Sequence, residues 1–151
     1  MAVTSSFSTI TNSIAALSIS GVTIKDIDEI PQSASLLLPI LFPRPNDFVT
    51  EFSQQFMSLG SNGAAKINFE YNLNYVFLYA EAGSGLGTYE LYNGLITKLS
   101  AILVAFASND AITGLVDLQT STIGSIGIVE GPSGQQYWGL MLSLHVLEFA
   151  Q

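Results

Sequence analysis

The clearest pattern in the chain lies over 65–80, where apolar and polar residues alternate strictly through the first ten positions. One set of alternate positions, from Ile67 to Tyr79, is entirely apolar or aromatic, and the other is polar from Lys66 to Asn74 before it also turns apolar. A period of two is typical of a β-strand, whose successive side chains point to opposite faces. We therefore predict one long strand with one solvent-facing or interface-facing side and an antiparallel neighbour.

Two other stretches carry a helical period. Residues 4–19 place apolar side chains at helical spacing and end before Gly21, and a longer pattern runs from about Tyr89 to Ala107. Thr88 is well placed to cap the second stretch. Both patterns predict helices with one apolar face.

Shorter apolar runs predict further strands. They occupy 21–27, 36–42 (interrupted by Pro39), 112–119, 122–131 and 135–149. Since proline lacks the ladder donor, we place the Pro39 strand at a sheet edge or a bulge. The segment 43–64 has neither period, so we predict a long loop or projecting arm there.

This order of elements indicates a single α+β domain over 1–151. We expect two layers, with the N-terminal and central helices packed on one face of a mostly antiparallel sheet, and 43–64 projecting from it.

Composition points to buried interfaces. Hydrophobic residues make up 48% and charged residues 11%, against roughly 25% charged residues in ordinary soluble domains. The most apolar windows (35–42, 95–107 and 138–149) are shorter than the roughly 18 to 20 residues that span a bilayer as a helix. The first residues lack the basic and apolar regions of a signal peptide. We expect no membrane partner and a soluble protein made in the cytoplasm.

The charge balance argues against nucleic-acid binding. The net charge is −8, and the cations are Lys25, Arg44, Lys66 and Lys98. Four scattered cations cannot supply a phosphate-binding footprint. An acidic surface can instead let DNA pass without adhering.

A glycine-rich turn, GSGLG at 83–87, follows the predicted long strand and precedes a helix, as phosphate-binding loops do. A dinucleotide fingerprint beginning at Gly83 and Gly85 needs a third glycine where Thr88 stands, and no lysine is near for a Walker loop. The turn is better interpreted as a flexible connection. We expect no cofactor.

Other candidate chemistry is sparse. His145 is the only histidine and the chain has no cysteine, so an ordinary transition-metal site is not expected. Ser143 lies on the same strand face as His145 and Glu148 on the other, which favours a structural or interface histidine over a catalytic triad. The acids Asp26, Asp28 and Glu29 lack the rest of a calcium loop. With Glu70 they are candidates for an acidic surface.

The predicted arm is the remaining positive signal. It is too apolar for a purely solvated loop, and it either folds back on its own domain or docks on a neighbour. The interface candidates are Phe42, Pro43, Arg44, Pro45, Asn46, Asp47, Phe48, Phe52 and Phe56.

The succession of segments resembles a family. An N-terminal helix is followed by GVTIKDIDEIP, LLLPILFPRPNDFVTEF, a tyrosine-rich strand ending in FLYAEAGSG, a long apolar helix, GLVDL and YWGLMLSLHVLEF. This order is similar to that of small tail-terminator or head-to-tail neck proteins of long-tailed, siphovirus-like bacteriophages, over nearly the whole chain.

The resemblance implies a structural protein, not an enzyme. Such proteins form a ring, typically a hexamer, that caps the tail tube and offers the head-attachment surface. Partners would be copies of itself, the tail tube protein and head-tail connector or neck proteins, with DNA only as passing cargo through an acid-lined channel. The protein would be assembled in the host cytoplasm and reside in the virion. A different neck or tail-completion protein, a small ligand-binding module whose pocket is lined by tyrosines, and a nucleotide- or sugar-processing enzyme using Gly83, Gly85, Gly87 and His145 are the alternatives.

Overall fold

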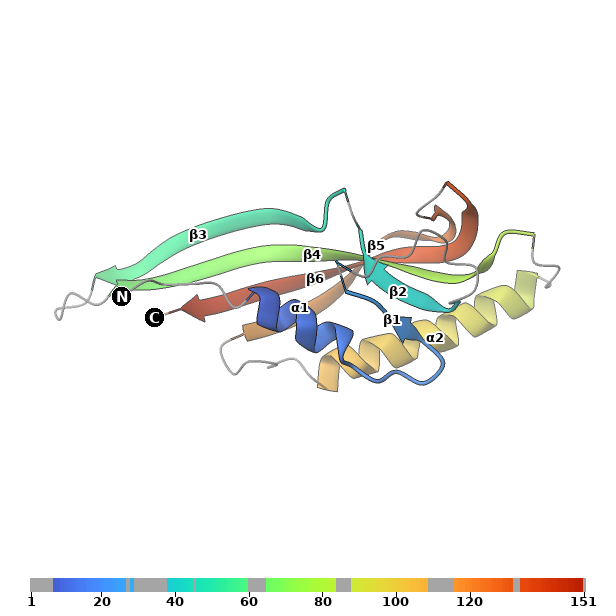
Figure 1. Ribbon diagram of the computed structural model, residues 1–151, viewed down its shortest axis with the longest axis horizontal. Coiled ribbons are helices and arrows are strands. Elements are labelled where there is room, and N and C mark those ends of the chain that lie inside the picture. Colours follow the sequence, from blue (N-terminus) through green and yellow to red (C-terminus); the bar gives the residue numbers. More distant parts are fainter. Residues whose placement is uncertain are drawn as a thin grey trace.

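The computed structural model describes residues 7–26, 28, 38–44, 46–59, 65–83, 88–108, 116–131 and 134–150. Two helices accompany a mostly antiparallel sheet, so the α+β prediction is confirmed (Figure 1). The elements are α1 (Phe7–Ala15), β1 (Thr23–Ile24), β2 (Ile40–Pro43), β3 (Val49–Leu59), β4 (Ala65–Glu81), α2 (Thr88–Ser108), β5 (Val116–Glu130) and β6 (Gln136–Ala150).

The predicted long strand is β4, and it is the centre of the sheet. The strand order is β1-β2-β4-β6-β5, and β3 also pairs with β4. Strand β6 pairs along one side of β4 over almost its whole length, while β2 and β3 follow one another along its other side. Every pairing is antiparallel except the short one between β1 and β2. The alternation in the sequence therefore predicted the strand on which the sheet is built.

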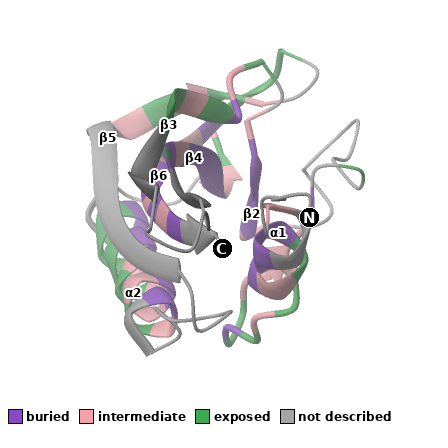
Figure 2. Ribbon diagram, turned by 90° about the vertical axis from the view of Figure 1, so that its left-hand side faces the viewer, coloured by how far each residue is buried: buried purple, intermediate pink, exposed green. Residues whose placement is uncertain are grey.

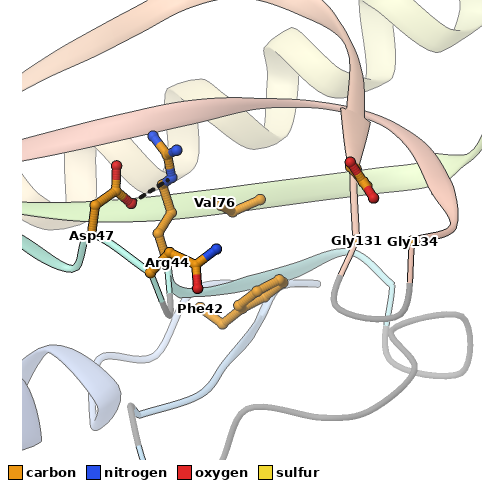
Figure 3. A pocket seen from close by; sticks show the side chains of 8 residues that line it. Phe42, Arg44, Asp47, Val76, Gly131 and Gly134 are labelled. Atoms are coloured by element: carbon orange, nitrogen blue, oxygen red, sulfur yellow. Dashed lines mark ion pairs between the residues drawn. The ribbon is translucent and has the colours of Figure 1, made fainter.

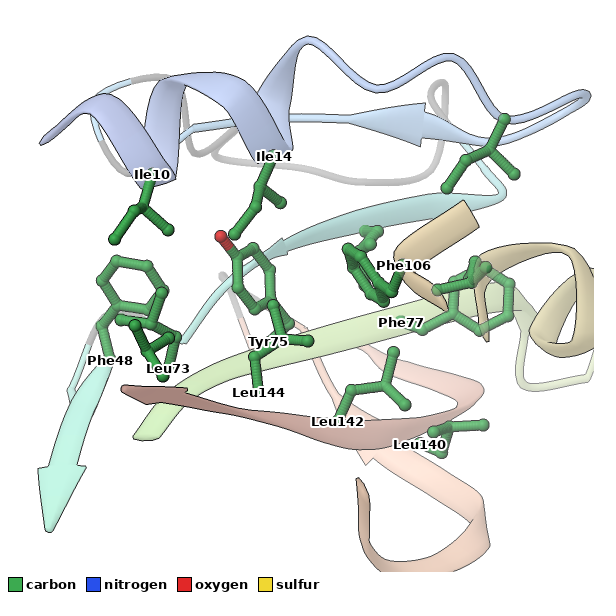
Figure 4. Close-up of a cluster of buried hydrophobic side chains, with 14 of the residues drawn as sticks. Ile10, Ile14, Phe48, Leu73, Tyr75, Phe77, Phe106, Leu140, Leu142 and Leu144 are labelled. Carbon is green, nitrogen blue, oxygen red and sulfur yellow. The ribbon is translucent and has the colours of Figure 1, made fainter. Parts of the chain in front are cut away.

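Both helices lie on the same side of the curved sheet (Figure 2). The main core forms between them and the alternate residues of β4 and β6 that face them, which explains the apolar set in the β4 pattern. Figure 4 shows Ile10 and Ile14 of α1 above Leu73, Tyr75 and Phe77 of β4. Leu95, Ile102 and Phe106 of α2 and Leu140, Leu142, Leu144 and Val146 of β6 complete it.

A second, smaller cluster lies on the opposite face of the sheet. It joins Ile40 and Phe42 of β2, Val76 and Leu78 of β4, and Tyr137 of β6. The loss of alternation near the end of β4 has this cause: that end is buried on both faces, as continuous apolar runs are.

Three predictions about elements were wrong. The segment 43–64 is not one long loop, because residues 49–59 form β3 and pair with β4 in a hairpin. Its polar side chains are those of an edge strand, which needs no clean apolar period. The two strands predicted at 112–119 and 122–131 are a single strand, β5, whose register irregularity between Ile123 and Gly127 lies within the second predicted span. Strand β2 starts after Pro39, so the proline does not interrupt it. It lies between β1 and β4, so it is not at the edge of the sheet.

Other boundaries moved by a few residues. Helix α1 ends at Ala15, before the predicted end at residue 19, and β1 is only two residues long. The ends of α2 and β6 each lie within about one residue of their predicted positions. Between β5 and β6, Gly134 adopts a positive φ of 83°.

Candidate functional site

The segment between β2 and β3 loops out of the sheet edge. Arg44 and Phe48 bond to the same residue of β4: the Arg44 N–H donates to the Asn74 carbonyl (3.0 Å), and the Asn74 N–H donates to the Phe48 carbonyl (2.8 Å). One side of β4 thus pairs first with β2 and then with β3. The segment between β2 and β3, which we call the excursion, leaves this side of β4 opposite Asn74 and returns to it opposite the same residue.

The Asn74 side chain closes the base of this excursion. Only 3% of the residue is exposed. Its Nδ2 donates to the Asp47 carbonyl (2.8 Å) and to the Thr50 hydroxyl (2.9 Å). A buried side-chain amide that bonds two residues at the β3 end of the segment holds the conformation there, since its loss would leave the Asp47 carbonyl without this donor.

Three of the predicted interface residues are instead buried in their own domain. Phe42 and Pro43 are buried, and Phe48 is only 8% exposed. Phe48 makes edge contacts with Phe7 and Tyr75, with ring centroids 6.0 and 5.4 Å apart. For these three residues the structure agrees with the alternative in which the segment folds back on its own domain.

The rest of the excursion forms one wall of a pocket of about 400 Å³. Arg44 and Asp47 are ion-paired (Nε to Oδ1, 3.0 Å) and Asn46 is exposed. Figure 3 shows Phe42 and Val76 between this pair and the turn that holds Gly131 and Gly134. Glu130 also lines the pocket. Its apolar floor and charged rim suit a small polar ligand or a partner's side chain.

A β-bulge in β3 presents an exposed aromatic ring. Glu51 and Phe52 both stand opposite Tyr71, and Glu51 has a φ of 56°, which is strained for a residue with a β-carbon. The extra residue turns Phe52 toward the helix-bearing face, where its ring stacks on Tyr71 at 5.6 Å and 19°. Phe52 is nonetheless 56% exposed. Among the described interface candidates, it is the aromatic ring that stays exposed.

The two other interface candidates cannot be placed. Pro45 lies outside the described residues, and so does the side chain of Phe56, although the Phe56 backbone pairs with Ile67 in the hairpin.

The outward side of α2 is unusually apolar. Tyr92, Ile96 and Val104 follow one another at multiples of four residues and are exposed, with Val104 at 64%. Leu91 and Leu95 lie in the core, whereas Tyr92 and Ile96 are exposed. The apolar stripe of α2 is wider than its contact with the sheet.

The predicted acidic surface is only partly exposed. Asp28 and Glu70 are exposed, whereas Asp26 is buried and Glu29 lies outside the described residues. Placing Asp26 on the acidic surface was wrong, because it is buried next to the core. Burial raises the pKa of the Tyr75 hydroxyl far above its ordinary value, and the charge of Asp26 raises it further.

His145 belongs to a cross-strand cluster on the open face of the sheet. Its Nε2 lies 3.0 Å from Glu70 Oε1, and its Nδ1 lies 2.9 Å from Asn72 Oδ1. Glu148 is on the opposite face, as predicted, and is buried there with the Tyr71 hydroxyl bonded to it. In the described part of the chain, no group of three or more His, Asp or Glu side chains is placed to hold a metal ion.

The glycine-rich turn is described only at its start. Gly83 has a positive φ of 79°, which favours glycine. Gly85 and Gly87 lie outside the described residues. Helix α2 begins at Thr88 with Glu90 in its first turn.

Within the described parts of the chain, neither helix has the length and apolar character that a membrane-spanning helix needs.

No protein-family model matches the chain, and a search of curated proteins finds no match either.

Sequence reasoning missed two residues that shape this region. Asn74 had a usable signal, since it is the last polar residue before the pattern of β4 turns apolar. Glu51 had none, because a bulge in an edge strand leaves no periodic mark in a short polar segment.

Proposed function

We propose that the protein is a structural component of a phage virion that forms a ring, with six copies, at the head-proximal end of a long tail. The ring terminates the tail tube and presents the surface to which the head attaches. The proposal starts from the order of segments along the chain, which resembles tail-terminator and neck proteins.

The observation that carries the proposal is the β3–β4 hairpin. Together with the end of β6 it reaches beyond both helices (Figure 1), and the strained bulge at Glu51 holds the exposed ring of Phe52 on it. Strain of this kind costs of order 1 kcal/mol or more and is found mainly where a function keeps it. A rigid hairpin with an exposed aromatic anchor suits contact between subunits.

Charge also favours a channel through which DNA passes. The chain has twelve acids and four cations. Arg44 is paired with Asp47, and Lys98 donates to the Ser20 carbonyl at 3.2 Å. Few cations remain for phosphate contacts, so a ring of copies at −8 each would repel the DNA backbone.

Electron microscopy of the protein alone and mixed with purified tail tubes tests the proposal. We expect rings of six copies, seated at one end of the tubes. Native mass spectrometry supplies the copy number. A protein that stays monomeric at high concentration and binds no tube would refute the proposal. Asn12→Ser, an exposed change on α1, is a control that should assemble normally, whereas Phe52→Ser should not.

Two alternatives make different predictions in the same work. A neck or tail-completion protein would form a ring that binds the head connector and leaves tail tubes bare. A ligand-binding module is favoured by the pocket beside Arg44. It would remain monomeric and gain thermal stability from a small polar ligand, and Arg44→Gln would abolish that gain.

A further inference from the structure

Besides the outer side of the two-residue β1, two long strand edges are left without a partner among the described residues. Strand β5 is the last strand on one side of the sheet, and β3 pairs only with β4 on the other. Each presents a row of backbone N–H and C=O groups over 15 and 11 residues respectively. Such rows are templates for pairing with another chain.

The two edges have opposite directions. Strand β3 is antiparallel to β4, β4 to β6, and β6 to β5. Strands β4 and β5 therefore run one way, and β3 and β6 the other. If a second copy is related to the first by rotation about an axis parallel to the strands, its β3 meets β5 of the first copy in antiparallel orientation. The strands β3, β4, β6 and β5 of successive copies are then all antiparallel to their neighbours.

The exposed apolar side chains near both edges lie on the same face. Val49 pairs with the core residue Leu73, and Phe52 stacks on Tyr71, so both belong to the helix-bearing face. Further along β5, beyond the part that is level with β3, Ile128 is 50% exposed and pairs with Trp138, whose ring contacts Tyr92 of α2. The rotation that joins the edges keeps these faces on the same side.

The two edges also overlap in level across the sheet. Val49 is level with Thr120, because both lie in the row of Leu73 and Leu144. Gln54 is level with Val116 in the same way, through Phe69 and Glu148. Residues 49–54 can thus face 116–120, with the bulge residues Glu51 and Phe52 both at the level of Leu118.

We infer that copies of this chain join head to tail by adding β3 of one copy to the β5 edge of the next. This rests on the proposed function and specifies the contact that builds its ring. An overlap of five residues of β5 provides about five main-chain hydrogen bonds, within the range of about 5 to 15 found in typical interfaces. Phe52 supplies the aromatic anchor. When two copies join through two different edges, the pair still has one free β3 edge and one free β5 edge. Further copies can add at these edges, and the assembly closes only as a ring.

Cysteine crosslinking tests the contact directly because the chain has no cysteine of its own. Val49→Cys is combined in turn with cysteine at Leu118, Thr120 or Thr122, the β5 positions that pair with core-facing residues of β6. Within one chain, two strands separate these sites, so their Cα atoms lie about 14 Å apart, too far for a disulfide. Every disulfide that forms is therefore between copies.

Mild oxidation should give at least one of the three pairs a ladder of covalent oligomers that ends at the ring size. Val49→Cys paired with Gln119→Cys, which pairs with His145 on the open face, should give no ladder. Rings that form without crosslinking in any of the three pairs would overturn the edge contact but leave the proposed function intact. The absence of both rings and crosslinks would overturn the two together.

Discussion

Replacing Asn74 by alanine should loosen the excursion between β2 and β3. The change deletes the two side-chain hydrogen bonds to Asp47 and Thr50, each worth about 0.5 to 1.5 kcal/mol net. It also leaves the Asp47 carbonyl without that donor, at about 1 to 3 kcal/mol if it stays buried. The backbone bonds of Asn74 to Arg44 and Phe48 survive.

One term offsets part of this loss. The buried Oδ1 of Asn74 has no hydrogen-bond partner among the described residues, so its removal relieves a desolvation cost. We therefore expect a net loss of roughly 1 to 3 kcal/mol in the free energy of unfolding. For a chain of this length that lowers the melting temperature by about 2 to 12 °C.

Urea and thermal unfolding followed by circular dichroism measure the effect. Asn93→Ala, an exposed site on α2, is the control and should stay within about 0.5 kcal/mol of the parent. Asn74→Asp keeps the shape of the side chain but replaces the donor with an acceptor facing a carbonyl, so it should cost at least as much as alanine. If Asn74→Ala and Asn74→Asp both behave like the control, the amide does not hold the excursion.

Three further predictions concern the core and the hairpin. Gly139→Ala should destabilise the fold severely because its new β-carbon would meet a backbone oxygen of β4. Gly127 pairs with Gly139 and has open space around it, so Gly127→Ala should be tolerated. Soluble yield and melting temperature compare the two variants. Since the pKa of Tyr75 is raised by burial, the folded chain binds this proton more tightly than the unfolded one, so stability should fall as the pH rises above about 10. Urea unfolding across that range should show a smaller decline for Tyr75→Phe, and an equal decline would contradict the assignment. Phe48→Ala should lower the free energy of unfolding by about 3 to 5 kcal/mol through the core of the single chain. Phe52→Ala should lower it by about 1 kcal/mol or less and should reduce the oligomeric ring in native mass spectrometry. The reverse pattern would refute our division of these aromatic side chains between core and interface.

Periodic patterns were sufficient where an element is buried on one side only. Strand β4 was predicted within a residue or two from its alternation, and α2 from its helical period. In both cases contact with the core imposes the period that the sequence records. The same logic placed His145 and Glu148 on opposite faces of β6.

The local sequence left β3 and the bulge at Glu51 undetermined. An edge strand pairs through its backbone on one side only, so its side chains need no apolar period and its residues resemble a loop. The fate of the phenylalanines near it depended on the same pairing. Phe48 is buried because the excursion closes at Asn74, and Phe52 is exposed because one extra residue opposite Tyr71 sets its direction.

The chain's own pattern thus determined the central strand, the two helices that cover it and the α+β class, because each of these follows from residues close together in sequence. Which aromatic rings are core and which are surface was decided by pairings between strands far apart in the chain. The free edges of β3 and β5 are likewise a property of the strand order in the folded sheet, which no local period encodes.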